Sequence, residues 1–287
     1  MAQSIVVTGA SSGIGLVTCL ELAGAGYDVI GTVRSLDKAE TLQREAAERG
    51  VAVHALALDV DDADACAAAV DEVAALTGGG PWALVNNAGF VQSGAVEDVP
   101  DSLVRAQLET NVVAPIRLAR LFMPGMRERG TGRIVNISSV AGRLSTPLMG
   151  WYCASKHALE AVTDSLRMEV EADGVRVVLV EPGMFGTPIW SATQEGGFPG
   201  PTTARYAAAY ARTEALAARS DRLPDPVWVA RTVRLALSNP VPLARYVVGA
   251  DAVGGLLAEA LVPTTVTDYV KALGTGLRRL PRLPFLG

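Results

Sequence analysis

Short apolar runs alternate along most of the chain with longer stretches in which apolar residues recur every three or four positions. The short runs are typical of strands buried in a parallel sheet, and the longer stretches of helices that pack on it. Strands are expected at Ser4–Val7, Val29–Val33, Val53–Leu58, Ala83–Val85, Arg133–Ile137, Arg176–Val180 and near Tyr246–Val248. Helices are expected at Ile14–Ala25, Lys38–Arg49, Asp61–Leu76, Asp101–Met123 and Trp151–Ala172. This alternation predicts an α/β fold with a doubly wound parallel sheet of about seven strands and helices on both faces.

Two later segments depart from this alternation. Residues 188–223 contain two glycine- or proline-rich breaks and then an alanine-rich helix, expected from about Thr203 to Ala218. We expect this segment to be an insertion that covers a substrate pocket. Residues 251–287 are expected to form an apolar, helical C-terminal extension. Because no repeat or low-complexity linker interrupts the chain, residues 1–287 are predicted to form a single domain.

Composition and charge narrow the class of partner. The net charge is −5 and only 5% of the residues are aromatic, which argues against a nucleic-acid partner. The three cysteines, Cys19, Cys66 and Cys153, are far apart and show no metal-binding spacing. Together with the lack of a signal peptide or an apolar run long enough to span a membrane, this favours a reduced, cytoplasmic protein without a metal site.

A glycine loop and a tyrosine–lysine pair carry the candidate chemistry. The loop, Thr8-Gly-Ala-Ser-Ser-Gly-Ile-Gly15, lies where the first strand should turn into the first helix, a position where helices bind the phosphates of a dinucleotide. Tyr152 and Lys156 are four residues apart and share one face of a helix, where a phenol and an ammonium can form an acid/base pair. Cys153 is expected to point away from that face. The sequence therefore predicts proton transfer beside a bound dinucleotide.

At these residues the chain resembles the short-chain dehydrogenases/reductases. The resemblance extends from about Ser4 to about Thr187 and is carried by the glycine loop, Asn86-Asn-Ala-Gly89, Asn111, Ser139, the Tyr152/Lys156 pair and Pro182-Gly183. It implies a Rossmann-like domain and hydride transfer between a nicotinamide cofactor and an alcohol or carbonyl carbon. The Val33-Arg34 pattern and the long C-terminal region resemble the hydroxysteroid and retinol dehydrogenases more than the small-sugar reductases.

The resemblance implies a catalytic role for four residues. Tyr152 would donate a proton to the carbonyl oxygen in reduction and remove it in oxidation, and Lys156 would lower the tyrosine pKa and bind the nicotinamide ribose. Ser139, thirteen residues before Tyr152, would hydrogen-bond the substrate oxygen. Asn111 would kink its helix and hold a water that connects the lysine to solvent. A polar residue on a solvated helix face is the alternative for Asn111.

The expected cofactor contacts follow from the same motifs. They are Gly9, Ser11, Ser12, Gly13, Ile14, Gly15, Arg34, Asp59, Val60, Asn87, Ala88, Gly89, Tyr152, Lys156, Pro182, Gly183 and Thr187. Arg34 follows the second strand, where no acidic residue stands, so NADP(H) is favoured and NAD(H) stays possible. Asp59 could instead cap the next helix, and Asn87 could brace the sheet.

The substrate is less constrained by the sequence. Six apolar residues flank the expected site and could line a pocket for a bulky hydrophobic carbonyl or alcohol: Met149, Trp151, Met184, Phe185, Trp190 and Phe198. The resemblance implies a homodimer first and a tetramer second. The basic terminus with Arg278, Arg279 and Arg282 is expected to pack on the protein rather than on an anionic membrane. Two other functions stay open, an NADP(H)-binding sensor or scaffold without turnover, and an isomerase or dehydratase that retains its cofactor.

Overall fold

The computed structural model describes residues 2–189 and 203–278. Its strands form one parallel sheet in the order β3-β2-β1-β4-β5-β6-β7. They are β1 (Ser4–Val7), β2 (Asp28–Val33), β3 (His54–Ala57), β4 (Ala83–Asn86), β5 (Gly132–Ile137), β6 (Val175–Pro182) and β7 (Arg245–Val248). The predicted doubly wound parallel sheet is therefore confirmed. The strand order reverses between β1 and β4, which is where such sheets open a crevice for ligands.

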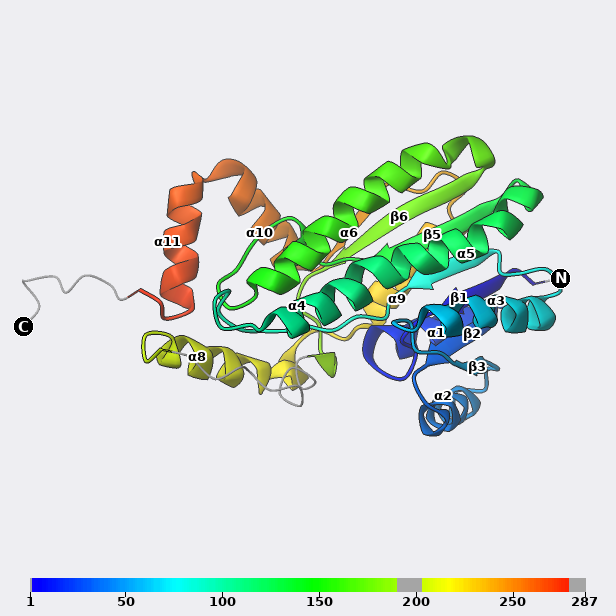
Figure 1. The fold of residues 1–287 in the computed structure, drawn as a ribbon, viewed down its shortest axis with the longest axis horizontal. Coiled ribbons are helices and arrows are strands. Elements are labelled where there is room, and N and C mark those ends of the chain that lie inside the picture. The colour runs from blue at the N-terminus through cyan, green and yellow to red at the C-terminus, as the bar shows by residue number, and fades with distance from the viewer. Residues whose placement is uncertain (1, 190–202, 279–287) are drawn as a thin grey trace, which may run out of the picture.

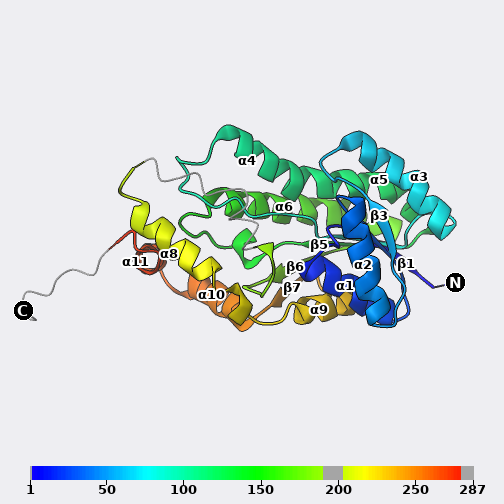
Figure 2. The ribbon, with the colours of Figure 1, turned by 90° about the horizontal axis from the view of Figure 1, so that it is seen from below.

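Helices cover both faces of the sheet, as Figures 1 and 2 show. One face is covered by α1 (Gly13–Gly24), α2 (Leu36–Glu48) and α9 (Val227–Ser238). The other face is covered by α3 (Ala63–Thr77), α5 (Ala114–Arg129) and α6 (Gly150–Glu169). The strands are apolar on both sides because both faces of the sheet are buried, which explains why they read as unbroken apolar runs.

The helix predicted over Asp101–Met123 differs from the structure in one respect. It consists of α4 (Asp101–Leu108), a π-helical turn (Glu109–Val113) and α5, and Asn111 lies inside that turn. The Asn111 side chain bonds the backbone of another segment, since its Oδ1 accepts the Phe90 N–H at 3.1 Å and its Nδ2 donates to the Phe90 carbonyl at 3.0 Å. Single π turns inside α-helices are frequent at functional sites.

Three helices from the last third of the chain lie beyond one end of the sheet, far from the N-terminus (Figure 1). They are α8 (Ala207–Ala217), α10 (Ala250–Leu261) and α11 (Thr264–Gly274). The Tyr210 hydroxyl of α8 accepts the Ala95 N–H at 2.9 Å and donates to the Asp98 carboxylate at 2.8 Å. Arg212 donates to the carbonyl of Leu273 at 3.2 Å, so α8 is fastened to both the loop after β4 and the end of α11.

Some expectations fall on residues outside the described ranges, namely Trp190, Phe198, Arg279 and Arg282. Within the described ranges, no helix combines the length and the apolar character needed to cross a bilayer.

Candidate active site

One cavity of about 630 Å³ collects the predicted site residues at the carboxyl ends of the strands. Every residue expected to contact the cofactor lines this cavity except Gly15. Ser139, Tyr152 and Lys156 line it as well, while Asn111 lies behind the lining. Segments that are far apart in the sequence thus meet at a single site.

The glycine loop presents the amino end of α1 to the cavity. The helix begins at Gly13, and the Ser12 side chain makes no capping hydrogen bond, so the first N–H groups of the helix can bind a phosphate. Gly13 has a φ of +53°, which favours glycine. A Cβ on Gly15 would lie 2.2 Å from the carbonyl oxygen of Gly9, so Gly15 serves close packing rather than cofactor contact. This cradle fits the pyrophosphate of a dinucleotide.

The edge of the cavity nearest β2 and β3 holds Arg34, Asp59 and Val60. The alternative that Asp59 caps the next helix is wrong, because Asp62 caps α3 by accepting the N–H groups of Asp64 at 2.9 Å and Ala65 at 3.0 Å. Arg34 is exposed and lines the cavity, and a guanidinium group is the side chain best suited to bind a phosphate.

Asn87 braces the sheet, as one of its two sequence-based interpretations predicts, and it also lines the cavity, where a cofactor contact stays a prediction. Its Nδ2 donates to the Thr8 carbonyl at 2.8 Å and to the Gly9 carbonyl at 3.2 Å, which ties β4 to the loop after β1. The Thr8 hydroxyl in turn accepts the N–H groups of Asn87 and Ala88, each at 3.0 Å. Asn87 also lines the cavity, so one residue braces the glycine loop and faces the dinucleotide site.

The candidate reacting centre is buried. The Tyr152 residue is 7% exposed and hydrogen-bonds Ser139 through its side chain. The Ser139 hydroxyl also accepts the Ala141 N–H at 3.1 Å, which orients it at the start of a short 3₁₀ turn. The Lys156 Nζ donates to the Ile137 carbonyl at 2.9 Å and lies 5.9 Å from the centre of the Tyr152 ring.

Burial dominates the ionisation of both groups. It raises the pKa of Tyr152 to about 12, while the hydrogen bond with Ser139 acts in the opposite direction. It lowers the pKa of Lys156 to about 8, while the charge of Glu160 acts in the opposite direction. Lys156 is not among the groups that shift the Tyr152 pKa here, since its ammonium donates to the Ile137 carbonyl. Its expected effect on the Tyr152 pKa stays a prediction. The phenol is held protonated at neutral pH.

Asn111 lies outside the cavity lining and is connected by hydrogen bonds to the helix that carries Tyr152. It is 1% exposed, so the alternative of a polar residue on a solvated face is wrong. Its Nδ2 donates to the Ser155 hydroxyl at 3.0 Å, and that hydroxyl donates to the Tyr152 carbonyl at 2.7 Å. The π turn is thus linked through two hydrogen bonds to the first turn of α6, which carries the tyrosine.

The apolar part of the lining agrees in part with the expectation. Met149, Met184 and Phe185 line the cavity. Trp151 does not, because its indole N–H donates to the Val96 carbonyl at 3.2 Å in an exposed position. The expectation that Cys153 points away is wrong, since it is buried and lines the cavity in a small apolar cluster with Tyr152.

Sequence reasoning missed several lining residues. Leu216 and Ala217 come from α8, and Thr275 follows α11. Asp251, at the start of α10, accepts the Met184 N–H at 2.7 Å and so fixes the backbone just after Pro182-Gly183. These partners are separated by long stretches of chain, and no local motif marks them. Among the described residues, no three His, Cys, Asp or Glu side chains gather as a metal site.

Two curated relatives match nearly the whole chain. The NADPH-dependent 3-dehydrocapnine reductase of Ornithobacterium rhinotracheale is 35% identical over 271 residues, which are 92% of this chain and 94% of the relative. Human retinol dehydrogenase 5 is 33% identical over 284 residues, which are 93% of this chain and 86% of the relative.

Solved structures share the fold. A short-chain dehydrogenase from Streptomyces avermitilis is 35% identical, with a TM-score of 0.77 over 95% of this chain and 97% of that one. A variant of actinorhodin polyketide ketoreductase with NADPH is 30% identical, with a TM-score of 0.74 over 89% of this chain and 97% of that one. The family described as short chain dehydrogenase matches residues 3–197. The chain is therefore an oxidoreductase of the short-chain dehydrogenase family.

Proposed function

We propose that this protein interconverts a secondary alcohol and a ketone or aldehyde with NADP(H), and that Tyr152 is the general acid and base. The single observation that carries the proposal is the placement of Tyr152, Ser139 and Lys156 on one cavity that continues to the open amino end of α1. When bound, the nicotinamide supplies or accepts the hydride. The protein must then supply a proton at the substrate oxygen.

The ionisation of the centre favours Tyr152 as a proton donor. A phenol with a pKa of about 12 is protonated at neutral pH and is available to the oxygen of a carbonyl that is being reduced. The Ser139 hydroxyl, which donates to the Pro182 carbonyl at 3.4 Å in this structure, lines the same cavity and can turn to donate to the substrate oxygen as negative charge develops on it. The Lys156 ammonium is one turn away on α6, where it can stabilise a phenolate after the proton has left.

The choice of NADP(H) rests on Arg34 and on the similar proteins. An arginine at the end of β2 can form charge-assisted hydrogen bonds with a 2′-phosphate, and no acid stands there to bind a 2′-hydroxyl instead. The names of a relative and of a solved neighbour that specify NADPH support the same choice.

The lining of the cavity supports a bulky hydrophobic substrate. Beside Tyr152 it is built mainly from apolar side chains of several segments: Val91, Leu144, Pro147, Met149, Cys153, Ile189, Leu216 and Leu223. Such a lining binds hydrocarbon well and leaves the few polar groups to orient the reacting carbonyl.

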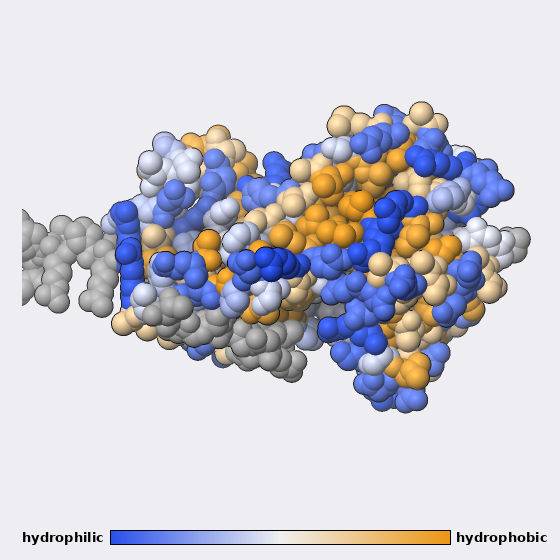
Figure 3. Space-filling view, viewed as in Figure 1, coloured by the Kyte–Doolittle hydropathy of each residue, from blue (hydrophilic) through white to orange (hydrophobic). Residues whose placement is uncertain are grey.

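A homodimer is proposed from the surface over α5 and α6. Figure 3 shows apolar side chains gathered on this side of the molecule. Val162 and Met168 of α6 and Val113 of the π turn are exposed, Met168 by 72%. Contiguous apolar patches on a protein surface mark sites of association. A Met168→Asp variant is expected to be monomeric in light scattering, and an unchanged mass would exclude this surface.

The function is tested by following nicotinamide absorbance against aldehydes and ketones of increasing apolar size, with NADPH and NADH in parallel. We expect turnover with NADPH that improves with apolar size, and loss of nearly all turnover in Tyr152→Phe with NADPH affinity retained. Binding of NADPH without turnover of any carbonyl or alcohol would instead indicate a sensor. Conversion of substrate without net NADPH consumption would indicate an isomerase or dehydratase.

A further inference from the structure

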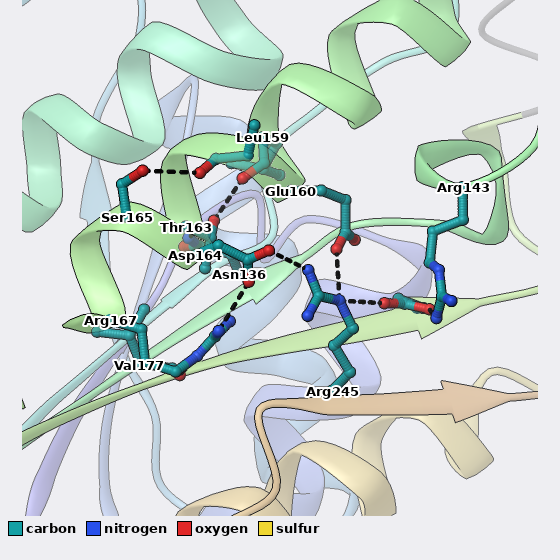
Figure 4. Close-up of polar contacts among 12 residues, drawn as sticks. Asn136, Arg143, Leu159, Glu160, Thr163, Asp164, Ser165, Arg167, Val177 and Arg245 are labelled. Atoms are coloured by element: carbon teal, nitrogen blue, oxygen red, sulfur yellow. Dashed lines mark hydrogen bonds and ion pairs between the residues drawn. The ribbon is translucent and has the colours of Figure 1, made fainter.

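A cluster of acids and arginines lies behind Lys156 and is drawn in Figure 4. Glu160 follows Lys156 by one helical turn on α6, and Glu181 lies near the end of β6. Arg245, the first residue of β7, joins them, because its Nε is 3.0 Å from Glu160 Oε2 and 3.1 Å from Glu181 Oε1. The Arg245 Nη2 also contacts the Asp164 carboxylate at 2.5 Å. The Glu160 and Glu181 side chains are 7% and 0% exposed, so the two glutamates are buried, whereas Arg245, Asp164 and Arg143 are partly exposed.

The network joins α6 and the turn after Ser139, which carry the candidate reacting groups, to β6, which ends at the cavity. α6 carries Tyr152 and Lys156, and β6 leads directly into Pro182-Gly183. Arg143 ends the short turn that begins after Ser139, and its Nη1 lies 3.5 Å from Glu181 Oε2. The ion pairs made by Arg245 of β7 and by Arg143 of this turn therefore fix the position of α6 relative to β6.

Only one of the two carboxylate oxygens of Glu160 has a partner in this network. Its Oε2 meets Arg245, but within the described residues its Oε1 is buried without a hydrogen bond. A buried carboxylate in this state is costly unless another positive charge is close. Lys156 lies one turn before Glu160 on the same face of α6, where residues four apart are neighbours, so its ammonium can supply that charge. The burial that lowers the Lys156 pKa is opposed by Glu160.

We propose that Glu160, held in place by Arg245, is a positioning residue that keeps the buried ammonium of Lys156 charged beside the reacting centre. This role rests on the proposed function, in which the charged lysine stabilises the phenolate. Glu160 acts through Lys156 and does not itself touch the substrate.

The other charged groups around Lys156 are accounted for by their own partners. Glu181 is shared between Arg143 and Arg245, and burial, followed by the charge of Glu160, raises its pKa. On the remaining elements that pack near α6, Asp251 accepts the Met184 N–H. Ion pairs join Glu109 to Arg117, Asp101 to Arg105, Glu171 to Arg176 and Asp173 to Arg127.

Asp164 offers a matched control. It lies one turn beyond Glu160 on α6 and pairs with the same Arg245, but Arg167 Nη1 also binds it at 2.7 Å. Burial raises the pKa of Asp164, yet the hydrogen bonds with Arg245 and Arg167 outweigh burial and lower it overall. Asp164→Asn therefore takes one carboxylate from Arg245, as Glu160→Gln does, without removing the acid next to Lys156.

The test is a direct titration of the lysine side chains by NMR. The chain contains only three lysines, Lys38, Lys156 and Lys271, so ¹³Cε-lysine labelling gives three signals that Lys→Arg variants assign. In Glu160→Gln we expect the Lys156 midpoint to move to lower pH, and in Asp164→Asn we expect it to stay at its wild-type value. Glu160→Asp, which keeps the charge, should restore most of the wild-type value.

The result that overturns the proposal is an unchanged Lys156 midpoint in Glu160→Gln, or an equal shift in Asp164→Asn. If Glu160→Gln does not fold, Glu160→Asp decides, because a shortened side chain should give a smaller shift in the same direction. The titration requires no turnover, so its outcome is independent of whether the proposed reaction is right. With the cognate carbonyl, the fall in kcat/KM between pH 6.5 and pH 8.5 should be larger in Glu160→Gln than in the wild type, whose Lys156, with a pKa of about 8, also loses charge over this range.

Discussion

Replacing Lys156 by methionine should stabilise the folded protein while it abolishes turnover. Holding a charged ammonium in a site that lowers its pKa from 10.5 to about 8 costs about 3 kcal/mol at pH 7. That value already includes the attraction of Glu160. Methionine fills the same space without a charge but leaves the Ile137 carbonyl without the lysine hydrogen bond, which costs about 1 kcal/mol.

The net gain for Lys156→Met is therefore about 2 kcal/mol at pH 7, or about 3 °C in Tm for a chain of this size. The gain has a defined pH dependence. Because the folded-state pKa of Lys156 lies below the ordinary value of 10.5, wild-type stability rises as the pH increases from about 8 to 10.5. The advantage of the variant is largest below pH 8 and shrinks above it.

The measurement is urea unfolding at a series of pH values, with Lys38→Met as the control. Lys38 lies in the outer helix α2 and is partly exposed, so its replacement should change the unfolding free energy by less than about 0.5 kcal/mol. A Lys156→Met protein that is less stable than wild type at pH 7, or an advantage that does not shrink above pH 8, would refute the reasoning.

Three further predictions test other parts of the site. Arg34→Ala should raise the Kd for NADPH at least about tenfold and leave that for NADH unchanged, as fluorescence titration with both cofactors can show; equal losses would argue against a phosphate contact. Gly15→Ala should destabilise the fold by more than about 2 kcal/mol through its clash with the glycine loop, whereas Gly24→Ala in the same helix meets no atom within 4 Å and should be neutral or slightly stabilising in thermal melts. Tyr210→Phe should cost about 1–3 kcal/mol in unfolding free energy and raise KM for large substrates more than for small ones, because it unfastens α8 from Asp98; equal KM changes would exclude a role of α8 in the substrate site.

The sheet could be predicted because its strands are buried on both faces. Ser4–Val7 and Ala83–Asn86 are buried throughout, so each reads as an apolar run whatever its neighbours are. The residues that end these strands carry local motifs, and parallel strands bring their carboxyl ends together. For this reason the glycine loop, Asn87 and Ser139 could be assigned to one site without a structure.

What the sequence could not predict depends on contacts between distant segments or on a single inserted residue. The π turn at Asn111 adds one residue to a helical repeat, which apolar periodicity does not resolve. Cys153 faces the cavity because α6 is buried over a wide arc, a width that depends on what packs against it. Asp251 and Met184 are separated by 67 residues, and no motif links them. The charges of Lys156 and Tyr152 likewise depend on burial, which spacing alone does not give.

The central claim is that hydride reaches a carbonyl carbon while Tyr152 protonates the oxygen. It is tested most directly with NADPH that carries deuterium on the transferring face of the nicotinamide and the best carbonyl of the panel. We predict that mass spectrometry finds one deuterium on the carbinol carbon of the product of the wild-type protein, and that Tyr152→Phe forms almost no product while it binds NADPH as before. Product without deuterium, or a Tyr152→Phe protein that turns over at the wild-type rate, would contradict the account.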